Sequence, residues 1–281
     1  MAQEKAAPVG PRPSVTAART TEKIAVDGRL SEADWSRALP AKEFLQRDPD
    51  EGKPATEATE VRFLYDDKAI YVGARMFDSE PSKIMKRLTR RDGDADGMAD
   101  YILVGFDALH DHLTGSIFGV TAAGSVLDGV MFNDSSDDDT WNGVWESAVS
   151  IDEKGWIAEM RIPFSQLRFT PSQRHVWGLH IVRSIQRKNE ESWWALVRKD
   201  DNGVISLAGE LSGLDALCAW PGNAEVSDDR VVASLDPGPE RRAVQGIGSC
   251  RFRTCTYKNA LRPQMPCDRC ATATSSTCRP V

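Results

Sequence analysis

Three aspartates precede an apolar segment in an order that suits calcium chemistry. Asp92, Asp94 and Asp96 alternate with small residues, and Gly97 follows them, which gives the D-x-D-x-D-G order of calcium loops. Ca²⁺ takes roughly six to eight oxygen ligands, and alternate residues of a tight loop can turn their carboxylates inward. Two hypotheses follow, a calcium site and a solvated acidic turn. The loop is not an EF-hand, because its twelfth position is Leu103 rather than a bidentate glutamate.

A second group of possible metal ligands is the pair His110 and His112. Their spacing places two imidazoles on the same side of an extended segment, with Asp111 between them and Asp107 just before. The sequence specifies no third ligand, whereas zinc sites usually have three or four protein ligands. We therefore interpret this segment as a solvated turn in preference to a metal pair.

Catalytic patterns are missing from the sequence. It contains no G-x-S-x-G, Walker or H-E-x-x-H pattern. A glycosidase needs two carboxylates across a cleft, and the many acidic residues would permit such a pair. However, no acidic residue stands out in an apolar setting that would raise its pKa. The sequence therefore predicts a protein that is not an enzyme.

Tryptophan is the residue type that best suits a sugar, because the C–H faces of a pyranose stack on indole rings. Trp141 lies in an acidic segment, and Trp193 and Trp194 follow "NEES". Neighbours in a strand point to opposite faces, so one of Trp193 and Trp194 should point out of the core. These three are the candidate sugar-binding residues. Three others lie in alternating strands and are assigned to the core: Trp145, Trp156 and Trp177.

The charge distribution excludes some partners. The formal net charge of the whole chain is -7. Residues 240–281 contain eight Lys/Arg and two Asp/Glu, so residues 1–239 contain 27 Lys/Arg and 40 Asp/Glu and have a net charge of -13. An acidic body repels phosphates, so nucleic acid and anionic membrane surfaces are not expected partners. No stretch approaches about 18 consecutive apolar residues, so no transmembrane helix is predicted.

The elements that would position these residues are mostly strands. A short strand near residues 23–26, an Asp27-Gly28 turn and a helix from about Glu32 come first, with Ser31 as N-cap and Trp35 facing the core. A β-hairpin turning at residues 66–68 follows. The further strand predictions are 101–107, 116–121, 126–132, 144–151, 156–162, 175–185, 193–198 and 204–207. This pattern predicts an all-β, antiparallel two-sheet sandwich, jelly-roll-like, with one short helix and disordered termini.

Three segments are expected along the chain. Residues 1–20 lack a periodic apolar face and are predicted to be a disordered leader, which resembles the start of an exported chain after removal of its signal peptide. Residues 21–217 form the β-sandwich. Residues 218–281 contain all six cysteines. A zinc site, a disulfide cluster and an unfolded tail from a shifted reading frame are the alternatives for this tail, and we favour the last.

Several motifs in this order resemble the carbohydrate-binding module family 9-like domain, in the version found N-terminal to a predicted outer-membrane barrel in bacterial proteins. The resemblance covers about Thr21 to Leu214. The motifs that carry it are "IAVDGRLSEADW", "TEVRFLYDDKAIYVGARMFD", "LTRRDGDADGMADYILVGFDALHDHLTGSIFGVTAAG" and "WNGVWESAVSIDEKGWIAEMRIPFSQLRF".

The resemblance implies a β-sandwich that binds a polysaccharide or oligosaccharide between two tryptophans and serves carbohydrate catabolism beside glycoside hydrolases. Trp194 matches the second tryptophan, but no Trp lies between Trp35 and Trp141, so Trp141 or a tyrosine would have to replace the first. The family also implies Ca²⁺, held here by some of Asp92, Asp94, Asp96 and Asp100. The implied location is periplasmic, outer-membrane-associated or extracellular. The alternative is a periplasmic interaction domain that packs beside an outer-membrane barrel and binds no sugar.

Overall fold

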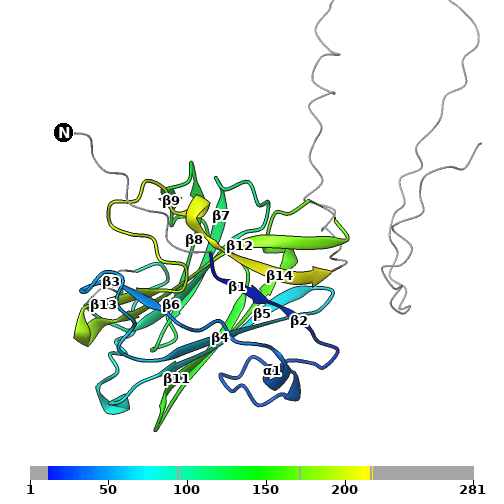
Figure 1. Cartoon of the computed structure of the whole chain (residues 1–281). Helices are drawn as coiled ribbons and strands as arrows, with labels where there is room; N and C mark the ends of the chain where they lie inside the picture. Colours follow the sequence, from blue (N-terminus) through cyan, green and yellow to red (C-terminus); the bar gives the residue numbers. More distant parts are fainter. Residues whose placement is uncertain (1–11, 94, 96, 171, 216, 218–281) are drawn as a thin grey trace, which may run out of the picture. The chain divides into compact units, whose positions relative to one another are not determined.

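Two β-sheets form the folded part of the chain (Figure 1). The structure, a computed structural model, describes residues 12–93, 95, 97–170, 172–215 and 217. The cysteine-rich tail expected at residues 218–281 and the first eleven residues lie outside the described residues.

The larger sheet has nine strands. Seven follow the order β1-β14-β12-β6-β7-β8-β9, and β13 pairs with β12 and with β3. The bounds are β1 Ser14–Thr16, β3 Leu45–Asp48, β6 Tyr101–Asp107, β7 Gly115–Thr121, β8 Val126–Phe132, β9 Ser136–Asp138, β12 Arg174–Ile185, β13 Glu190–Trp193 and β14 Gly209–Asp215.

The smaller sheet has five strands in the order β10-β11-β5-β4-β2. They are β2 Ala18–Arg19, β4 Thr59–Tyr65, β5 Ala69–Phe77, β10 Glu146–Asp152 and β11 Gly155–Pro163. The helical elements are α1 Ala33–Arg37 and the 3-10 turns η1 Pro81–Lys83, η2 Phe164–Gln166, η3 Gln186–Lys188 and η4 Ile205–Leu207. Among the described residues, no helix has the length and apolarity that crossing a membrane requires.

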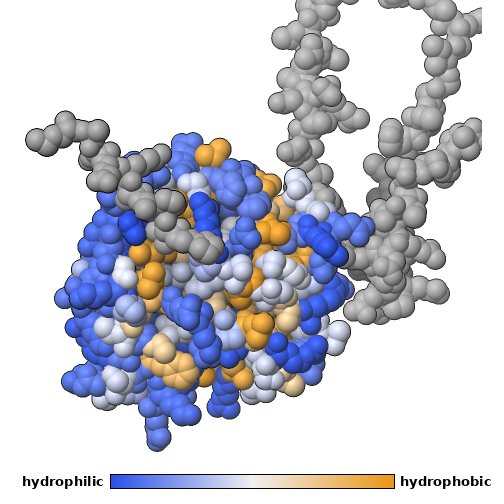
Figure 2. Space-filling view, in the orientation of Figure 1, coloured by the Kyte–Doolittle hydropathy of each residue, from blue (hydrophilic) through white to orange (hydrophobic). Residues whose placement is uncertain are grey.

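The main core fills the space between the sheets, as the alternation in each strand dictates. In β6, Ile102, Val104 and Phe106 belong to this core, and β11 contributes Trp156, Ala158, Met160 and Ile162. Trp156 and Trp177 are fully buried, which confirms their assignment to the core, whereas Trp145 is only partly buried at its edge. On the face drawn in Figure 2, hydrophilic residues surround small separate apolar groups.

The prediction of an all-β sandwich is confirmed, but four of its details are wrong. The sandwich is not purely antiparallel, because β1 pairs parallel to β14 and β2 parallel to β4. The predicted strand near residues 23–26 is irregular, and the segment 204–207 contains η4 instead of a strand. The strand predicted at 193–198 ends at Trp193.

The expected leader also needs correction. Residues 12–20 are not disordered, since β1 and β2 add one strand to the edge of each sheet. Their ladder partners lie in β14 and β4, so the backbone hydrogen bonds of this segment come from residues distant in sequence. No local periodicity could therefore reveal it.

The N-cap of the helix lies one residue later in the chain than predicted. Glu32 is the N-cap of α1, and no side chain caps this terminus, so Ser31 does not have the predicted role. Asp34 instead accepts a hydrogen bond from Thr20 Oγ1 at 2.6 Å and pairs with Arg37. Trp35 is buried as predicted, in a smaller cluster outside the main core.

Candidate functional site

The outer face of the nine-stranded sheet carries a cavity of about 290 Å³. Alternation in β6 sends Leu103, Gly105 and Asp107 to this face, opposite the core residues of the same strand. In the ladders, His180 lies opposite Gly105, and Gly178 opposite Asp107. Gly105 and Gly178 have no side chains, so the sheet surface is recessed between the larger neighbours.

The walls of this cavity, which we call the Trp193 cavity, come from widely separated parts of the chain. Strand β13 supplies Trp193, the short strand β3 supplies Arg47, and Val204 and Ile205 come from the segment at η4. The polar side chains that line it are Arg47, Asp107, Ser116, Ser135, Asp137, His180 and Glu191. The cavity thus combines one indole with several polar groups, the composition of a small-molecule site.

Trp193 is held in place by three neighbours. Its Nε1 donates a hydrogen bond of 2.7 Å to Glu191 Oε1. The His180 ring meets it edge to face with the ring centroids 5.4 Å apart, and the Arg47 guanidinium lies over the indole, 5.4 Å from its centroid. The orientation of the indole is therefore fixed before any ligand enters.

His180 acts in this cavity as a neutral group. Its Nε2 lies 2.8 Å from the carbonyl oxygen of Val204, and a carbonyl can only accept, so Nε2 carries the proton. Burial lowers the pKa of His180 to about 4. The ring therefore contributes no positive charge near neutral pH.

Trp194 lies on the opposite face of the sheet. It is 5% exposed and belongs to the main core, whereas Trp193 packs in a separate cluster with Val182 and Val197. The two neighbours thus point to opposite faces, and Trp193 is the one that points out of the main core. Both indoles are largely buried, since Trp193 is only 8% exposed, but Trp193 lines the Trp193 cavity and Trp194 does not. A sugar-binding role for Trp194 stays a prediction.

Trp141 lines a different cavity of about 540 Å³, which we call the Trp141 cavity. Its ring packs edge to face on Phe118 with the centroids 6.0 Å apart. Phe132, Gln166 and Arg168 also line this cavity. This cavity and the Trp193 cavity share lining residues, but Trp141 does not line the Trp193 cavity and Trp193 does not line this one. The shared residues are Phe106, Gly115, Ser116 and Met131.

The acidic loop gives a mixed result for calcium. Asp94 and Asp96 lie outside the described residues. Asp92 Oδ1 accepts a hydrogen bond from the Asp128 backbone, and Asp100 Oδ1 accepts one from Gln186, while Asp100 Oδ2 has no hydrogen-bond partner. In the described part of the chain, no group of three or more His, Cys, Asp or Glu could hold a metal ion. Since Asp94 and Asp96 lie outside the described residues, calcium binding at this loop stays a prediction.

The histidine pair sits in an exposed turn. The rings of His110 and His112 are 4.7 Å apart, and both residues have positive φ angles. The Asp107 carboxylate fastens the turn by accepting hydrogen bonds from the backbone of Asp111 and His112. These contacts agree with the solvated turn that the sequence favours.

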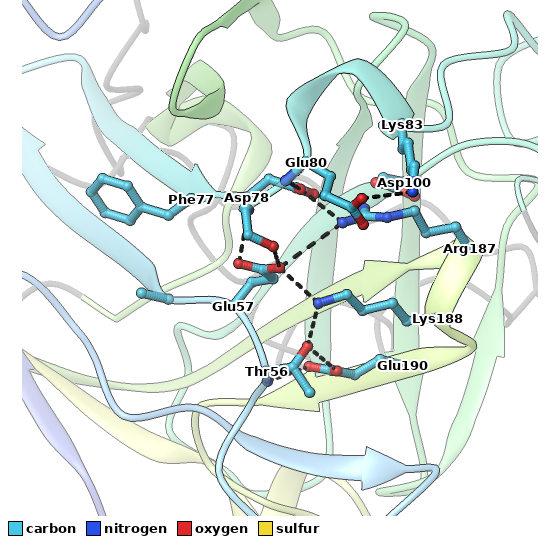
Figure 3. A network of polar contacts seen from close by, with 12 residues as sticks. Thr56, Glu57, Phe77, Asp78, Glu80, Lys83, Asp100, Arg187, Lys188 and Glu190 are labelled. Atoms are coloured by element: carbon cyan, nitrogen blue, oxygen red, sulfur yellow. Dashed lines mark hydrogen bonds and ion pairs between the residues drawn. The ribbon is translucent and has the colours of Figure 1, made fainter.

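A network of charged side chains at the β12–η3 end of the larger sheet is structural (Figure 3). Arg187 forms two hydrogen bonds of 2.7 Å to Asp78, and Lys188 forms one of 2.7 Å to Glu57. Burial alone would raise the pKa of Asp78, but the Arg187 guanidinium holds it below its usual value. The carboxylates of Asp78 and Glu57 thus each form an ion pair with a basic side chain, as in a buried ion-pair network.

Burial raises the pKa of Asp92 above its usual value. Two further carboxyls have strongly raised pKa values, which the sequence did not lead us to predict. Burial raises the pKa of Glu159 to about 7 and that of Asp100 to about 6. Glu159 accepts hydrogen bonds from the backbone of Asp27 and Gly28 and from Trp35 Nε1, so it fastens the turn before α1. The signal was present in "WIAEMRI", where Glu159 stands among apolar residues. Neither carboxyl lines the Trp193 cavity.

Comparison with solved structures gives the class of the fold. A family 9 carbohydrate-binding module from Caldicellulosiruptor kristjanssonii, in complex with cellotriose, matches over 80% of this chain and 100% of its own, with a TM-score of 0.51 and 14% identity. A Bacteroides uniformis protein named for an inferred carbohydrate-binding role matches over 72% of this chain and 99% of its own, with a TM-score of 0.57 and 11% identity.

The chain therefore has a fold like that of the family 9 carbohydrate-binding modules. At these identities the similarity concerns the fold alone. No protein-family model and no curated protein matches the sequence.

Proposed function

We propose that this chain is a non-catalytic carbohydrate-binding module and that its saccharide enters the Trp193 cavity. The observation that carries the proposal is the combination of an indole with polar side chains in a recess of about 290 Å³ on a fold of this class. Pyranose rings need an apolar plate and directional hydrogen-bond partners, and this recess offers both.

The roles divide between the indole and the polar side chains around it. Trp193 is the stacking plate, and Glu191 keeps its orientation through the 2.7 Å hydrogen bond to Nε1. Asp137 and Ser135 at β9 lie within the same lining and would take sugar hydroxyls. A sugar that stacks on the side of the indole that Arg47 covers would displace this guanidinium, which would then be available to a ring oxygen.

The test is a titration of the full chain with cello-oligosaccharides and xylo-oligosaccharides, followed by tryptophan fluorescence and calorimetry. Trp193→Ala should weaken binding about tenfold or more, about 1.4 kcal/mol for each tenfold. Trp141→Ala should leave binding unchanged, because Trp141 lines the neighbouring Trp141 cavity and not the Trp193 cavity. If Trp141→Ala abolishes binding and Trp193→Ala does not, the site is the Trp141 cavity.

The cellular setting is also a proposal. We propose that the module is exported to the periplasm or cell surface and is tethered to a larger protein that acts on polysaccharides. Its competitor is an interaction domain beside an outer-membrane barrel, which predicts no response to any soluble or insoluble glycan. A glycan array with the purified chain distinguishes the carbohydrate-binding module from the interaction domain. If the chain binds certain saccharides and the Trp193→Ala variant does not bind them, the interaction-domain hypothesis is wrong.

A further inference from the structure

The Trp193 cavity continues into a second recess with an acidic wall. This second recess, about 250 Å³ and here called the Asp137 cavity, shares Leu103, Ile117 and Asp137 with the Trp193 cavity. Its other acidic lining residues are Asp92, Asp128, Asp138 and Asp139. The two recesses are therefore neighbours on the same outer face of the sheet, and carboxylates line both.

Few cations balance these carboxylates. Arg91 is paired with Asp128 and lies 3.6 Å from Asp92, and Arg47 lies over Trp193 with its nearest approach to Glu191 at 3.8 Å. Within the described ranges, the side chains of Asp137 and Asp139 form neither an ion pair nor a hydrogen bond. Both are exposed on the acidic wall. Their charges are thus free to meet a ligand.

A third carboxylate lies buried in the floor of the Trp193 cavity. The side chain of Asp107 is only 1% exposed, and its two oxygens accept hydrogen bonds from the backbone of Asp111 and His112. Within the described residues, the nearest side chain that could carry a positive charge is His112, whose Nδ1 lies 3.9 Å away. A buried carboxylate without a fixed countercharge is costly, and a cationic ligand in the cavity would offset that cost.

Resting on the proposed function, we infer that the saccharide of this site carries ammonium groups, as do oligosaccharides of glucosamine. An ammonium supplies three donors and a positive charge to a lining that offers mainly acceptors. Uronic acids would meet like charges. The acidic wall thus sets the charge of the ligand, and Trp193 supplies the plate for its sugar ring.

The experiment is a calorimetric comparison of four tetrasaccharides, those of glucosamine, N-acetylglucosamine, glucose and galacturonic acid, at pH 6 with a chelator present. The glucosamine tetramer should bind about tenfold more tightly than the neutral ones, as expected for one charge-assisted hydrogen bond. Its advantage should shrink with added salt and as the pH rises through the pKa of its amines. The galacturonic acid tetramer should not bind.

The matched variants concern the acidic wall and a distant acidic residue. The Asp137→Asn/Asp139→Asn double variant should lower the affinity for the glucosamine tetramer several-fold more than that for the glucose tetramer. Glu153→Gln, in the β10–β11 turn of the other sheet, should change neither the affinity for the glucosamine tetramer nor that for the glucose tetramer. Trp193→Ala should weaken the binding of both tetramers about tenfold or more.

The outcomes separate this inference from the proposed function. Equal or tighter binding of the glucose tetramer overturns the ammonium inference and leaves the carbohydrate site standing. Glucosamine binding that Trp193→Ala leaves unchanged is attraction to an acidic surface and overturns the inference as well. If the chain binds none of the four tetrasaccharides and gives no response to other glycans, both the proposed function and this inference are wrong.

Discussion

At the scale of residues, buried carboxyls govern how this protein responds to pH. Asp100 is 1% exposed, one of its oxygens has no hydrogen-bond partner, and burial raises its pKa to about 6. Arg183 and Arg187 oppose the shift without cancelling it. A carboxyl of an unfolded chain has a pKa near about 3.9, so the folded state binds this proton more tightly.

A loss of stability with rising pH follows from this difference. The contribution of Asp100 is fully present below the unfolded pKa and is lost as the pH rises through about 6. The loss amounts to about 2 to 3 kcal/mol between pH 4 and pH 7, at about 1.4 kcal/mol for each pKa unit. The Asn side chain in Asp100→Asn cannot ionise, so this variant should not lose this part of its unfolding free energy. Its unfolding free energy should therefore increase relative to that of the unmodified protein as the pH rises.

Urea unfolding of both proteins at pH 4, 5, 6 and 7, in the presence of a chelator, measures this difference. Asp200→Asn, at an exposed position, is the control and should follow the unmodified protein at each pH. A free-energy difference between Asp100→Asn and the unmodified protein that stays constant over this range contradicts the prediction.

Calcium binding remains a proposal at this scale. If Asp92, Asp94, Asp96 and Asp100 share an ion, calcium removes their mutual repulsion and should raise the melting temperature by a few degrees, or about 1 to 3 kcal/mol. Asp94→Asn/Asp96→Asn should abolish the shift and leave the metal-free protein at least as stable. Thermal unfolding with calcium and with a chelator tests this proposal. Identical unfolding curves for the unmodified protein in the two conditions would show that the proposal is wrong.

At the scale of elements, the turn between β10 and β11 depends on a glycine. Gly155 has φ +134°, and a Cβ there would lie 2.0 Å from the Met76 carbonyl oxygen in β5. Gly155 also faces Phe77 in the β11–β5 ladder, so a side chain at this position would push two paired strands apart. Gly52 offers a contrast, because it too has a positive φ, +81°, but a Cβ at that position would meet no atom within 4 Å.

These two glycines form a matched pair of substitutions. Gly52→Ala should cost about 1 kcal/mol of unfolding free energy, from the backbone conformation alone. Gly155→Ala should cost at least about 2 kcal/mol more, because backbone atoms that belong to a ladder cannot move aside cheaply. Urea unfolding of both variants measures the gap, and equal losses would show that the close approach of β5 to this turn is not tight.

At the scale of the whole molecule, one core joins both sheets, and Trp194 is part of it. Trp194→Ala should therefore lower the unfolding free energy by about 3 to 5 kcal/mol, as for large-to-small changes in a core. Trp193→Ala removes a side chain from the outer face and should cost less, so this variant can still fold and report on binding. Denaturant unfolding of the two variants, beside circular dichroism spectra, provides the comparison. A larger loss for Trp193→Ala would contradict the division of the two faces.

The sequence determined the class of fold and the central strands, because their signal is local. Strands β6 and β8 have the bounds that alternation predicts, residues 101–107 and 126–132. Alternation also predicts that Trp193 and Trp194 point to opposite faces. Each of these properties depends on neighbours within a few positions of the chain.

Only the tertiary structure decided which tryptophan faces outward and what surrounds it. The choice follows from the pairing of β13 with β12, in which Trp193 lies opposite Val182 on the outer face. Arg47, Asp107, His180 and Trp193 meet in one cavity although they come from β3, β6, β12 and β13. The short edge strands β1 and β2 likewise exist through partners far along the chain. Long-range pairing depends on the register and order of strands, and a periodic pattern within one segment does not encode either.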